Sequence, residues 1–385
     1  MKIIYFLLTL CLIDFQSQAQ TIFGDNNYTQ YHIGNLPIII SVPHGGLVVP
    51  NSIPDRTCNN PALDHDFRTI ELARQIDTAL FKLTGCHPHL IICNLQKRKL
   101  DCNRSIADGA CGNIQAEKAW TEFHNFIDTA QSRVANKFPN KALYIDLHGH
   151  GKPILRLELG YGLTNSMLNN DDNFLNSTSV IANNSSLENL VSKNTNGYTH
   201  SQLIRGQYSL GTMFVNAGFP AVPSQQMPNP GQTPFFPGGY NTFHYTSILQ
   251  SNRTDGLQIE CDTTVRFGYL NRKKFADSIA SIFIKFMSIH HNINLKTNCG
   301  IEANNTGSLD NCFNIITNPV TSVVKLSTNT LSSNYEVIVI NTTGEIVLRV
   351  KNQNQFSVEF LPKGMYFIKV VEDQKNTCTK KIIVQ

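Results

Sequence analysis

The 385-residue sequence lacks any apolar run long enough to cross a membrane as a helix. Its longest candidate, Ile3 to Ile13, falls well short of the ~20 apolar residues that a bilayer core requires. This run follows Lys2 and precedes a small-residue site at 17–19, an arrangement typical of a cleavable signal peptide. The sequence therefore predicts a signal peptide over residues 1–19 and an exported mature chain without a transmembrane anchor.

Long basic clusters and paired C-x-x-C motifs are also missing. The densest basic groups, at 97–99 and 380–381, are short and lack interleaved aromatic residues, so nucleic-acid binding is not expected. Cys11 lies in the predicted signal peptide, which leaves nine of the ten cysteines. In an oxidising compartment this odd number predicts at least one free or intermolecular cysteine. A structural zinc cluster has little support.

Apolar runs alternate with helical patterns over residues 20–300. Short apolar runs bounded by turn residues are typical of strands in a buried, mostly parallel sheet, and apolar residues at helical spacing predict the helices between them. The sequence thus predicts an α/β fold with a twisted mixed, mostly parallel sheet between helices. The predicted strands are 37–42, 89–95, 143–147, 155–161 and 256–261, and the predicted helices are 69–83, 115–138 and 271–291.

Three further segments differ in composition from these elements. Residues 165–196 are rich in Asn and Ser and are predicted to form loops, while 223–241 contain five prolines and three glycines and form a candidate active-site loop. Near Asn304 helical periodicity ends. A linker is predicted over 301–310, and the short alternating runs after it predict a small all-β sandwich over 311–385.

Two histidines lie where predicted strands end, His44 in the first strand's Pro-His-Gly-Gly turn and His148 at the end of a later strand. In parallel sheets, ligands bind beyond the carboxyl ends of the strands. Zinc hydrolases need three protein ligands, an open position for water and a nearby carboxylate that moves protons. Asp66, before a helix, is the candidate third ligand, and Asp64 is its rival. Alternatively, Asp66 only caps the helix and each histidine is a polar residue of a loop.

Other polar residues fit the same chemistry. The guanidinium of Arg104 is suited to hold a carboxylate by two parallel hydrogen bonds, although a surface ion pair is its more ordinary role. Glu260 ends a strand and would face the same crevice, unless it marks a solvated edge. Asp146, two residues before His148, would orient a ligand or bond the edge of the sheet.

Six segments together resemble the N-formylglutamate amidohydrolase-like family, which is related to the zinc carboxypeptidases and the aspartoacylases. The resemblance spans roughly residues 38–266 and implies the twisted mixed sheet of the zinc carboxypeptidases for the catalytic domain, 20–300. The segments are 41–46, 98–104, Trp120 with His124, 145–151, 238–241 and 258–260.

This resemblance implies one zinc ion per chain. His44 and His148 would be ligands, with Asp66 in the place of the carboxypeptidases' glutamate, and Glu260 would be the catalytic glutamate. Carboxypeptidases have His-x-x-Glu, whereas His44 is followed by Gly-Gly-Leu, so the carboxylate ligand is the least certain assignment. The predicted substrate-binding residues are Asn103 and Arg104 for a carboxylate, Arg98 or Arg205 for the oxyanion, and Tyr240 in the Gly-Gly-Tyr-Asn motif.

The tail resembles the C-terminal sorting domain of type IX secretion, through segments 317–320, 361–366 and 381–383. The resemblance implies a Bacteroidota-type bacterium, contact with the type IX machinery, passage from the periplasm to the surface or medium, and removal of the tail. The alternative is an ordinary immunoglobulin-like binding module.

The sequence therefore predicts a secreted zinc hydrolase that cleaves an amide bond of an N-acyl amino acid or a small peptide-like molecule with a free carboxylate. One alternative is a zinc exopeptidase acting on peptides or cell-wall stem peptides. Another is a non-catalytic surface binding protein with a structural metal. The acyl group, the amino acid, the disulfide pairing, the oligomeric state and the cleavage of the C-terminal domain stay open.

Overall fold

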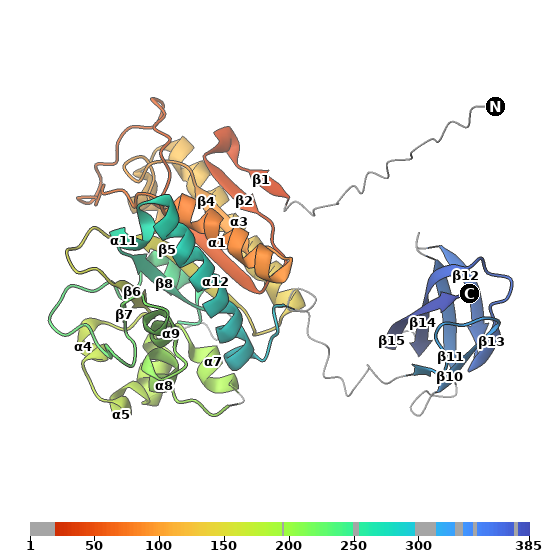
Figure 1. Ribbon diagram of the computed structural model, residues 1–385. Coiled ribbons are helices and arrows are strands. Elements are labelled where there is room, and N and C mark those ends of the chain that lie inside the picture. The colour runs from red at the N-terminus through yellow and green to blue at the C-terminus, as the bar shows by residue number, and fades with distance from the viewer. Residues whose placement is uncertain are drawn as a thin grey trace, which may run out of the picture. The chain divides into compact units, whose positions relative to one another are not determined.

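The computed structural model describes residues 20–194, 196–248, 254–296, 313–327, 334–341, 345–372 and 376–385. The chain divides into two compact units, residues 1–301 and 302–385 (Figure 1). The predicted signal peptide and the predicted linker lie outside the described residues. Within the described part of the chain, no helix combines the length and the apolar character needed to cross a bilayer.

An eight-stranded sheet forms the centre of the first unit, in the order β1-β2-β4-β3-β5-β8-β6-β7. The central strands β4, β3, β5 and β8 are mutually parallel, whereas β2 and β6 pair with them in antiparallel fashion. This confirms the predicted mixed, mostly parallel sheet. The strands are β1 (Thr21–Phe23), β2 (Thr29–His32), β3 (Ile38–Val42), β4 (His89–Cys93), β5 (Leu143–Gly149), β6 (Leu157–Gly160), β7 (Ala221–Val222) and β8 (Asp255–Cys261).

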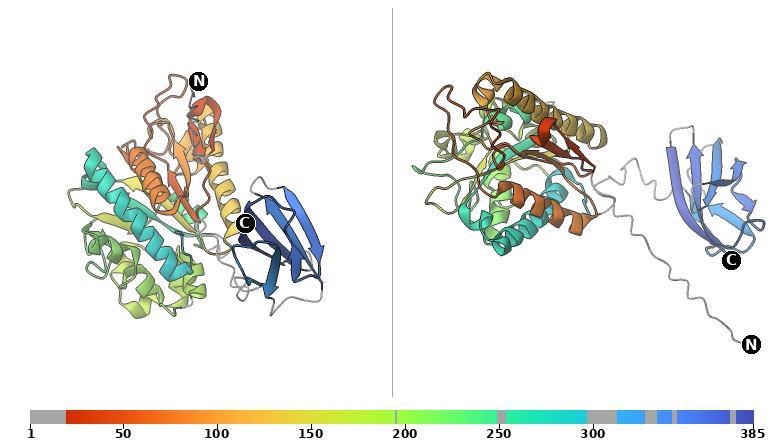
Figure 2. Two further views of the ribbon diagram at one scale, coloured as in Figure 1. Left: turned by 45° about the vertical axis from the view of Figure 1, so that its right-hand side comes forward. Right: turned by 90° about the horizontal axis from the view of Figure 1, so that it is seen from above.

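Helices cover both faces of this sheet. Figure 2 shows α1 (Thr69–Thr84) and α12 (Tyr269–His291) side by side on one face and α3 (Ile114–Lys137) on the other. The buried residues of α1 recur three to four positions apart, as expected for a helix with one face in the core. The shorter helices are α2 (Ile106–Ala110), α8 (His200–Arg205), α9 (Leu210–Asn216), α10 (Tyr240–Tyr245), α11 (Thr263–Arg266) and the single 3-10 turn Asp25–Asn27.

The prediction that residues 165–196 form only loops is wrong. Four short helices occupy this segment, and the side chains of Thr164 and Asp171 cap the first two by accepting backbone N–H groups. Each helix also buries an apolar residue, which provides the packing that one or two turns need. The helices are α4 (Asn165–Leu168), α5 (Asp172–Leu175), α6 (Thr178–Asn184) and α7 (Glu188–Lys193).

The second unit contains two antiparallel sheets, in the orders β13-β10-β9 and β12-β11-β14-β15. Buried residues from both sheets, such as Val324 and Ile368, belong to one apolar core, so the sheets pack as a sandwich. This confirms the predicted β domain after the α/β domain. The strands are β9 (Asn314–Ile315), β10 (Val323–Ser327), β11 (Tyr335–Asn341), β12 (Ile346–Lys351), β13 (Gln355–Ser357), β14 (Gly364–Glu372) and β15 (Asn376–Val384).

Candidate metal centre and active site

Two imidazoles and one carboxylate converge at the carboxyl ends of β3 and β5. His44 follows β3, His148 lies near the end of the neighbouring parallel strand β5, and Asp66 precedes α1. Asp66 Oδ2 is 3.4 Å from His44 Nδ1 and 3.1 Å from His148 Nδ1. All three residues are buried, and their ligand atoms lie within 4.8 Å of one another.

This donor set fits a metal ion. His44 Nδ1 is buried and makes no hydrogen bond, although it faces Asp66 Oδ2. A buried polar atom without a partner costs free energy, and a cation between the three ligand atoms would remove that cost. Two imidazole nitrogens and a carboxylate oxygen are ligands that suit zinc. Asp64 lines the cavity that His44, Asp66 and His148 also line, but it is not part of this group of possible ligands.

Each histidine is oriented by a second carboxylate. His44 Nε2 lies 2.6 Å from Asp101 Oδ1, and His148 Nε2 lies 2.7 Å from Asp146 Oδ2. A proton on Nε2 makes each imidazole the donor of this hydrogen bond and leaves the Nδ1 lone pair for a metal. Burial alone would raise the pKa of Asp101, but the neighbouring His44 lowers it below its usual range. Asp101 thus stays ionised as the acceptor.

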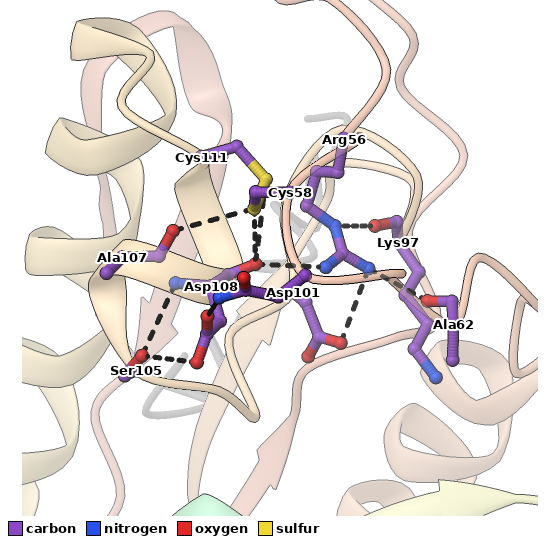
Figure 3. Close-up of a disulfide and its surroundings, with 10 residues drawn as sticks. Arg56, Cys58, Ala62, Lys97, Asp101, Ser105, Ala107, Asp108 and Cys111 are labelled. Atoms are coloured by element: carbon purple, nitrogen blue, oxygen red, sulfur yellow. Dashed lines mark hydrogen bonds and ion pairs between the residues drawn. A yellow bond between two sulfur atoms is a disulfide. The ribbon is translucent and has the colours of Figure 1, made fainter.

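The Asp101 carboxylate is anchored by Arg56, a buried residue of the loop between β3 and α1 (Figure 3). Arg56 Nη2 lies 3.4 Å from Asp101 Oδ2, while its other N–H groups donate to backbone carbonyls, including that of Lys97 at 2.9 Å. Two residues further on, Cys58 forms a disulfide with Cys111 at the end of α2. The loop that carries Asp66 is therefore fixed both covalently and by hydrogen bonds.

Three described cysteines are free and buried, which agrees with the expectation from their odd number. They are Cys93, Cys102 and Cys261.

Glu260 lines the same cavity as His44, Asp66 and His148, from the adjacent strand β8. Its register partner on β5 is His148, and Gln258 Nε2 donates to Glu260 Oε1 at 2.9 Å. Burial raises the pKa of Glu260 to about 7, against the opposing effect of His148. Glu260 lies outside the group of three convergent ligand atoms. A carboxyl group in this position can accept and return a proton without binding the metal.

Asn103, Arg104 and Tyr240 lie in the same cavity. Asn103 Nδ2 is 3.2 Å from His148 Nε2, and its Oδ1 accepts the backbone N–H of Asn241 at 2.8 Å. The Arg104 side chain is exposed and donates no hydrogen bond to a described residue, while its carbonyl accepts Trp120 Nε1 at 3.0 Å. The Tyr240 ring stacks on His244. Arg104 is thus the guanidinium available to a substrate.

The cavity has a volume of about 980 Å³ and opens onto the ligand group. Its walls come from the segments that follow β3, β4, β5 and β8 and from the Pro-rich loop. The lining includes His44, Asp66, His148, Glu260, Asn103, Arg104, Tyr240, Lys97, Lys152, Phe67, Phe236, Phe267 and Arg266.

Arg98 and Arg205, the residues expected to contact an oxyanion, are not among the residues that line the cavity. Arg98 donates to Gln96 Oε1 at 2.5 Å and pairs with Asp55. Arg205, on α8, is held by Asp172 at 2.6 Å and by backbone carbonyls of the helical segment 165–175. Both guanidinium groups therefore already have hydrogen-bond or ion-pair partners.

The sequence analysis missed three residues that build the centre. Asp101 and Gln258 lie inside segments 98–104 and 258–260, in which the predicted site residues are Arg98, Asn103, Arg104 and Glu260. Asn241 Nδ2 donates to Asp146 Oδ1 at 3.2 Å and so supports the carboxylate that orients His148. The order of strands in the sheet, which the sequence does not show, brings these segments together.

The C-terminal residues 314–385 match the family model described as the secretion system C-terminal sorting domain. This match indicates secretion or cell-surface localisation through the type IX system and implies interaction with its machinery. No curated protein matches the chain.

Two solved structures share a remote similarity with the chain. One is gene product Atu2144 from Agrobacterium tumefaciens, at 11% identity over 66% of this chain and 90% of that chain, with a TM-score of 0.39. The other is the apo form of the N-acetylmuramyl-L-alanine amidase Ami1 from Mycobacterium abscessus, at 11% identity over 65% of this chain and 98% of that chain, with a TM-score of 0.26. Neither similarity assigns an activity to this chain.

We expect the purified protein to contain about one zinc ion per chain and the His148→Ala variant to lose it, because this change removes one of three convergent ligands. Elemental analysis after mild dialysis measures the metal, with circular dichroism to check folding. His87→Ala, which changes a histidine paired with Asp77 away from the cavity, should keep the metal. If the wild-type protein contains no transition metal and added zinc restores no hydrolysis, the assignment is wrong.

Asp101→Asn should weaken zinc binding about 10- to 100-fold, because His44 loses the carboxylate that accepts its Nε2 proton. Competition with a chromophoric chelator measures this affinity. Asp55→Asn is the matched control, since Asp55 is an exposed carboxylate with basic partners. Equal zinc affinity in the two variants would show that Asp101 does not orient the ligand.

Proposed function

We propose that the protein is a secreted zinc-dependent hydrolase of the N-formylglutamate amidohydrolase-like type. It cleaves an amide bond in an N-acyl amino acid or a small peptide-like substrate with a free carboxylate. The observation that supports this most is the convergence of two imidazole Nδ1 atoms and one carboxylate oxygen beside a buried glutamate, in one large cavity. The proposal includes a zinc carboxypeptidase-like fold for the first unit.

His44, Asp66 and His148 would hold the zinc ion. When bound, zinc supplies Lewis-acid polarisation of the amide carbonyl and lowers the pKa of water. A structural zinc site is closed by four protein ligands, whereas three convergent residues beside an open cavity leave a position for water. This favours a catalytic over a structural metal.

The substrate carboxylate binds Arg104 and Asn103. The exposed fork of Arg104 can donate two parallel hydrogen bonds to a carboxylate, as planar guanidinium groups do. Asn103 accepts the backbone N–H of Asn241 and donates to Gln258 Oε1, which fixes the position of this pair relative to the candidate metal ligands. The amide bond beside the bound carboxylate is thereby aligned with the centre.

Glu260 transfers the proton. It accepts a proton from the attacking water while the water oxygen bonds to the amide carbon, and it returns this proton to the nitrogen as the carbon–nitrogen bond breaks. The products are a carboxylic acid and a free amine. Gln258 holds the Glu260 carboxyl group through its amide, so that the proton acceptor stays directed at the cavity.

An assay of the zinc-loaded protein against N-acyl amino acids and peptides tests the proposal. Release of a carboxylic acid from N-acyl amino acids supports it. Stepwise release of terminal amino acids from peptides would make the protein an exopeptidase, and bound zinc without turnover of any amide would make it a binding protein.

Glu260→Gln should lower kcat about 10²- to 10⁴-fold while leaving the zinc content near one per chain, because an amide keeps the shape but cannot accept the proton. Steady-state kinetics and elemental analysis on the same sample measure both effects. Glu71→Gln on α1 is the control, since that carboxylate only pairs with Arg68 at the surface. Full zinc with wild-type kcat would remove Glu260 from the mechanism, and lost zinc would make it a ligand.

Removal of residues 302–385 should leave hydrolysis unchanged but keep the enzyme in the periplasm, because the predicted catalytic residues lie in the first unit and the sorting domain in the second. Activity measured in periplasmic and extracellular fractions checks this. If the truncated protein folds but loses activity, the second unit contributes to the active site.

A further inference from the structure

The catalytic cavity has two chemically different walls. Lys97 and Arg104 supply positive charge on one wall. Three phenylalanines also line the cavity, Phe67, Phe236 and Phe267, and they are 50%, 41% and 44% exposed. Exposed aromatic side chains gathered in a cavity usually mark a surface that an apolar ligand covers.

The order of the strands separates the two walls. Lys97 and Arg104 follow β4, which lies two strands from β5 on one side. Phe267 follows β8 and α11, and the backbone N–H of Phe236 donates to Glu158 of β6, which lies two strands from β5 on the other side. Neighbouring strands are about 4.8 Å apart, so β6 lies about 10 Å from β5. The wall formed by the phenylalanines therefore extends to about 10 Å from the ligand group at the end of β5.

Charged residues fix the aromatic wall, which consists of Phe67, Phe236 and Phe267. Arg266 donates to the backbone carbonyls of Phe67 and His150 and so ties the Phe67 loop to the loop that bears Phe267. Lys152 lies over the Phe236 ring, 3.7 Å from its centroid, and its ammonium pairs with Glu158 at 2.7 Å. The buried Glu158 also pairs with Arg156 at 3.2 Å, so the Lys152 ammonium on this wall shares a carboxylate partner with a second cation.

The cavity is also large for a formyl or acetyl amino acid. Its volume of about 980 Å³ is at the upper end of the range for sites that enclose drug-sized ligands. A short acyl group placed at the metal ligands would leave the phenylalanines in water. An extended apolar group would cover them and gain the free energy of their burial.

We propose that the substrate is an amino acid whose amide nitrogen carries an extended apolar acyl chain of about eight carbons, and that Phe67, Phe236 and Phe267 form the acyl subsite. This inference rests on the proposed amide hydrolysis and specifies its substrate class. The carboxylate binds at Arg104, the amide lies at the metal ligands, and the acyl chain runs from β5 toward β6 over the three rings.

Binding to the zinc-loaded Glu260→Gln protein tests the subsite without turnover. Calorimetry with N-acetyl-, N-butanoyl-, N-hexanoyl- and N-octanoyl-glutamate should show affinity rising by up to about fourfold per added methylene. Phe267→Ala and Phe236→Ala in the same background should flatten this dependence, whereas Phe267→Leu should largely retain it. Phe174→Ala on α5 is the matched control and should leave the dependence unchanged, since Phe174 is exposed but does not line the cavity.

Turnover by the wild-type protein then separates the two proposals. A kcat/KM that rises with chain length supports both. Hydrolysis of the N-acetyl substrate with no gain from longer chains overturns the acyl subsite and leaves amide hydrolysis intact. Chain-length-dependent binding without hydrolysis of any of the four compounds overturns amide hydrolysis but leaves an apolar binding subsite. A strong preference for an amide that carries a sugar in place of the alkyl chain also overturns the acyl subsite.

Discussion

The parallel register of β3, β5 and β8 is the constraint on which the candidate site depends. Strands that run in the same direction end at the same edge, so His44, His148 and Glu260 meet although more than 200 residues separate the first from the last. A shift of one residue in either pairing would turn a side chain to the opposite face of the sheet. Backbone pairing in the core therefore sets the geometry of the chemistry.

Burying this many polar groups carries a large desolvation cost, which the site offsets with connected hydrogen bonds. Asp146 shows how this works: its Oδ2 bonds His148, while its Oδ1 accepts from Ser41 Oγ at 2.6 Å and from Asn241. Both oxygens of this carboxylate thus have partners. Among the described residues, His44 Nδ1 is one of the buried atoms without a hydrogen-bond partner, and it is an atom a metal would use.

The sequence predicts the α/β sheet, the β domain and the residues that converge as possible ligands, because apolar runs and the polar residues that end them are local signals. It does not predict the carboxylate that orients His44, because Asp101 becomes its neighbour only through the pairing of β3 with β4. For a related reason it does not predict the partners of Arg98 and Arg205. An arginine has many potential partners, and only the folded chain shows that Asp55 and Asp172 bind these two.

The disulfide between Cys58 and Cys111 gives the site a dependence on cellular compartment. It anchors the loop that leads from His44 to Asp66, and such bonds persist in oxidising surroundings and are reduced in the cytosol. Before export, the same chain would lack this anchor and would hold Asp66 less rigidly. Export thus does more than deliver the protein, because it also supplies the oxidising conditions under which the site takes its final form.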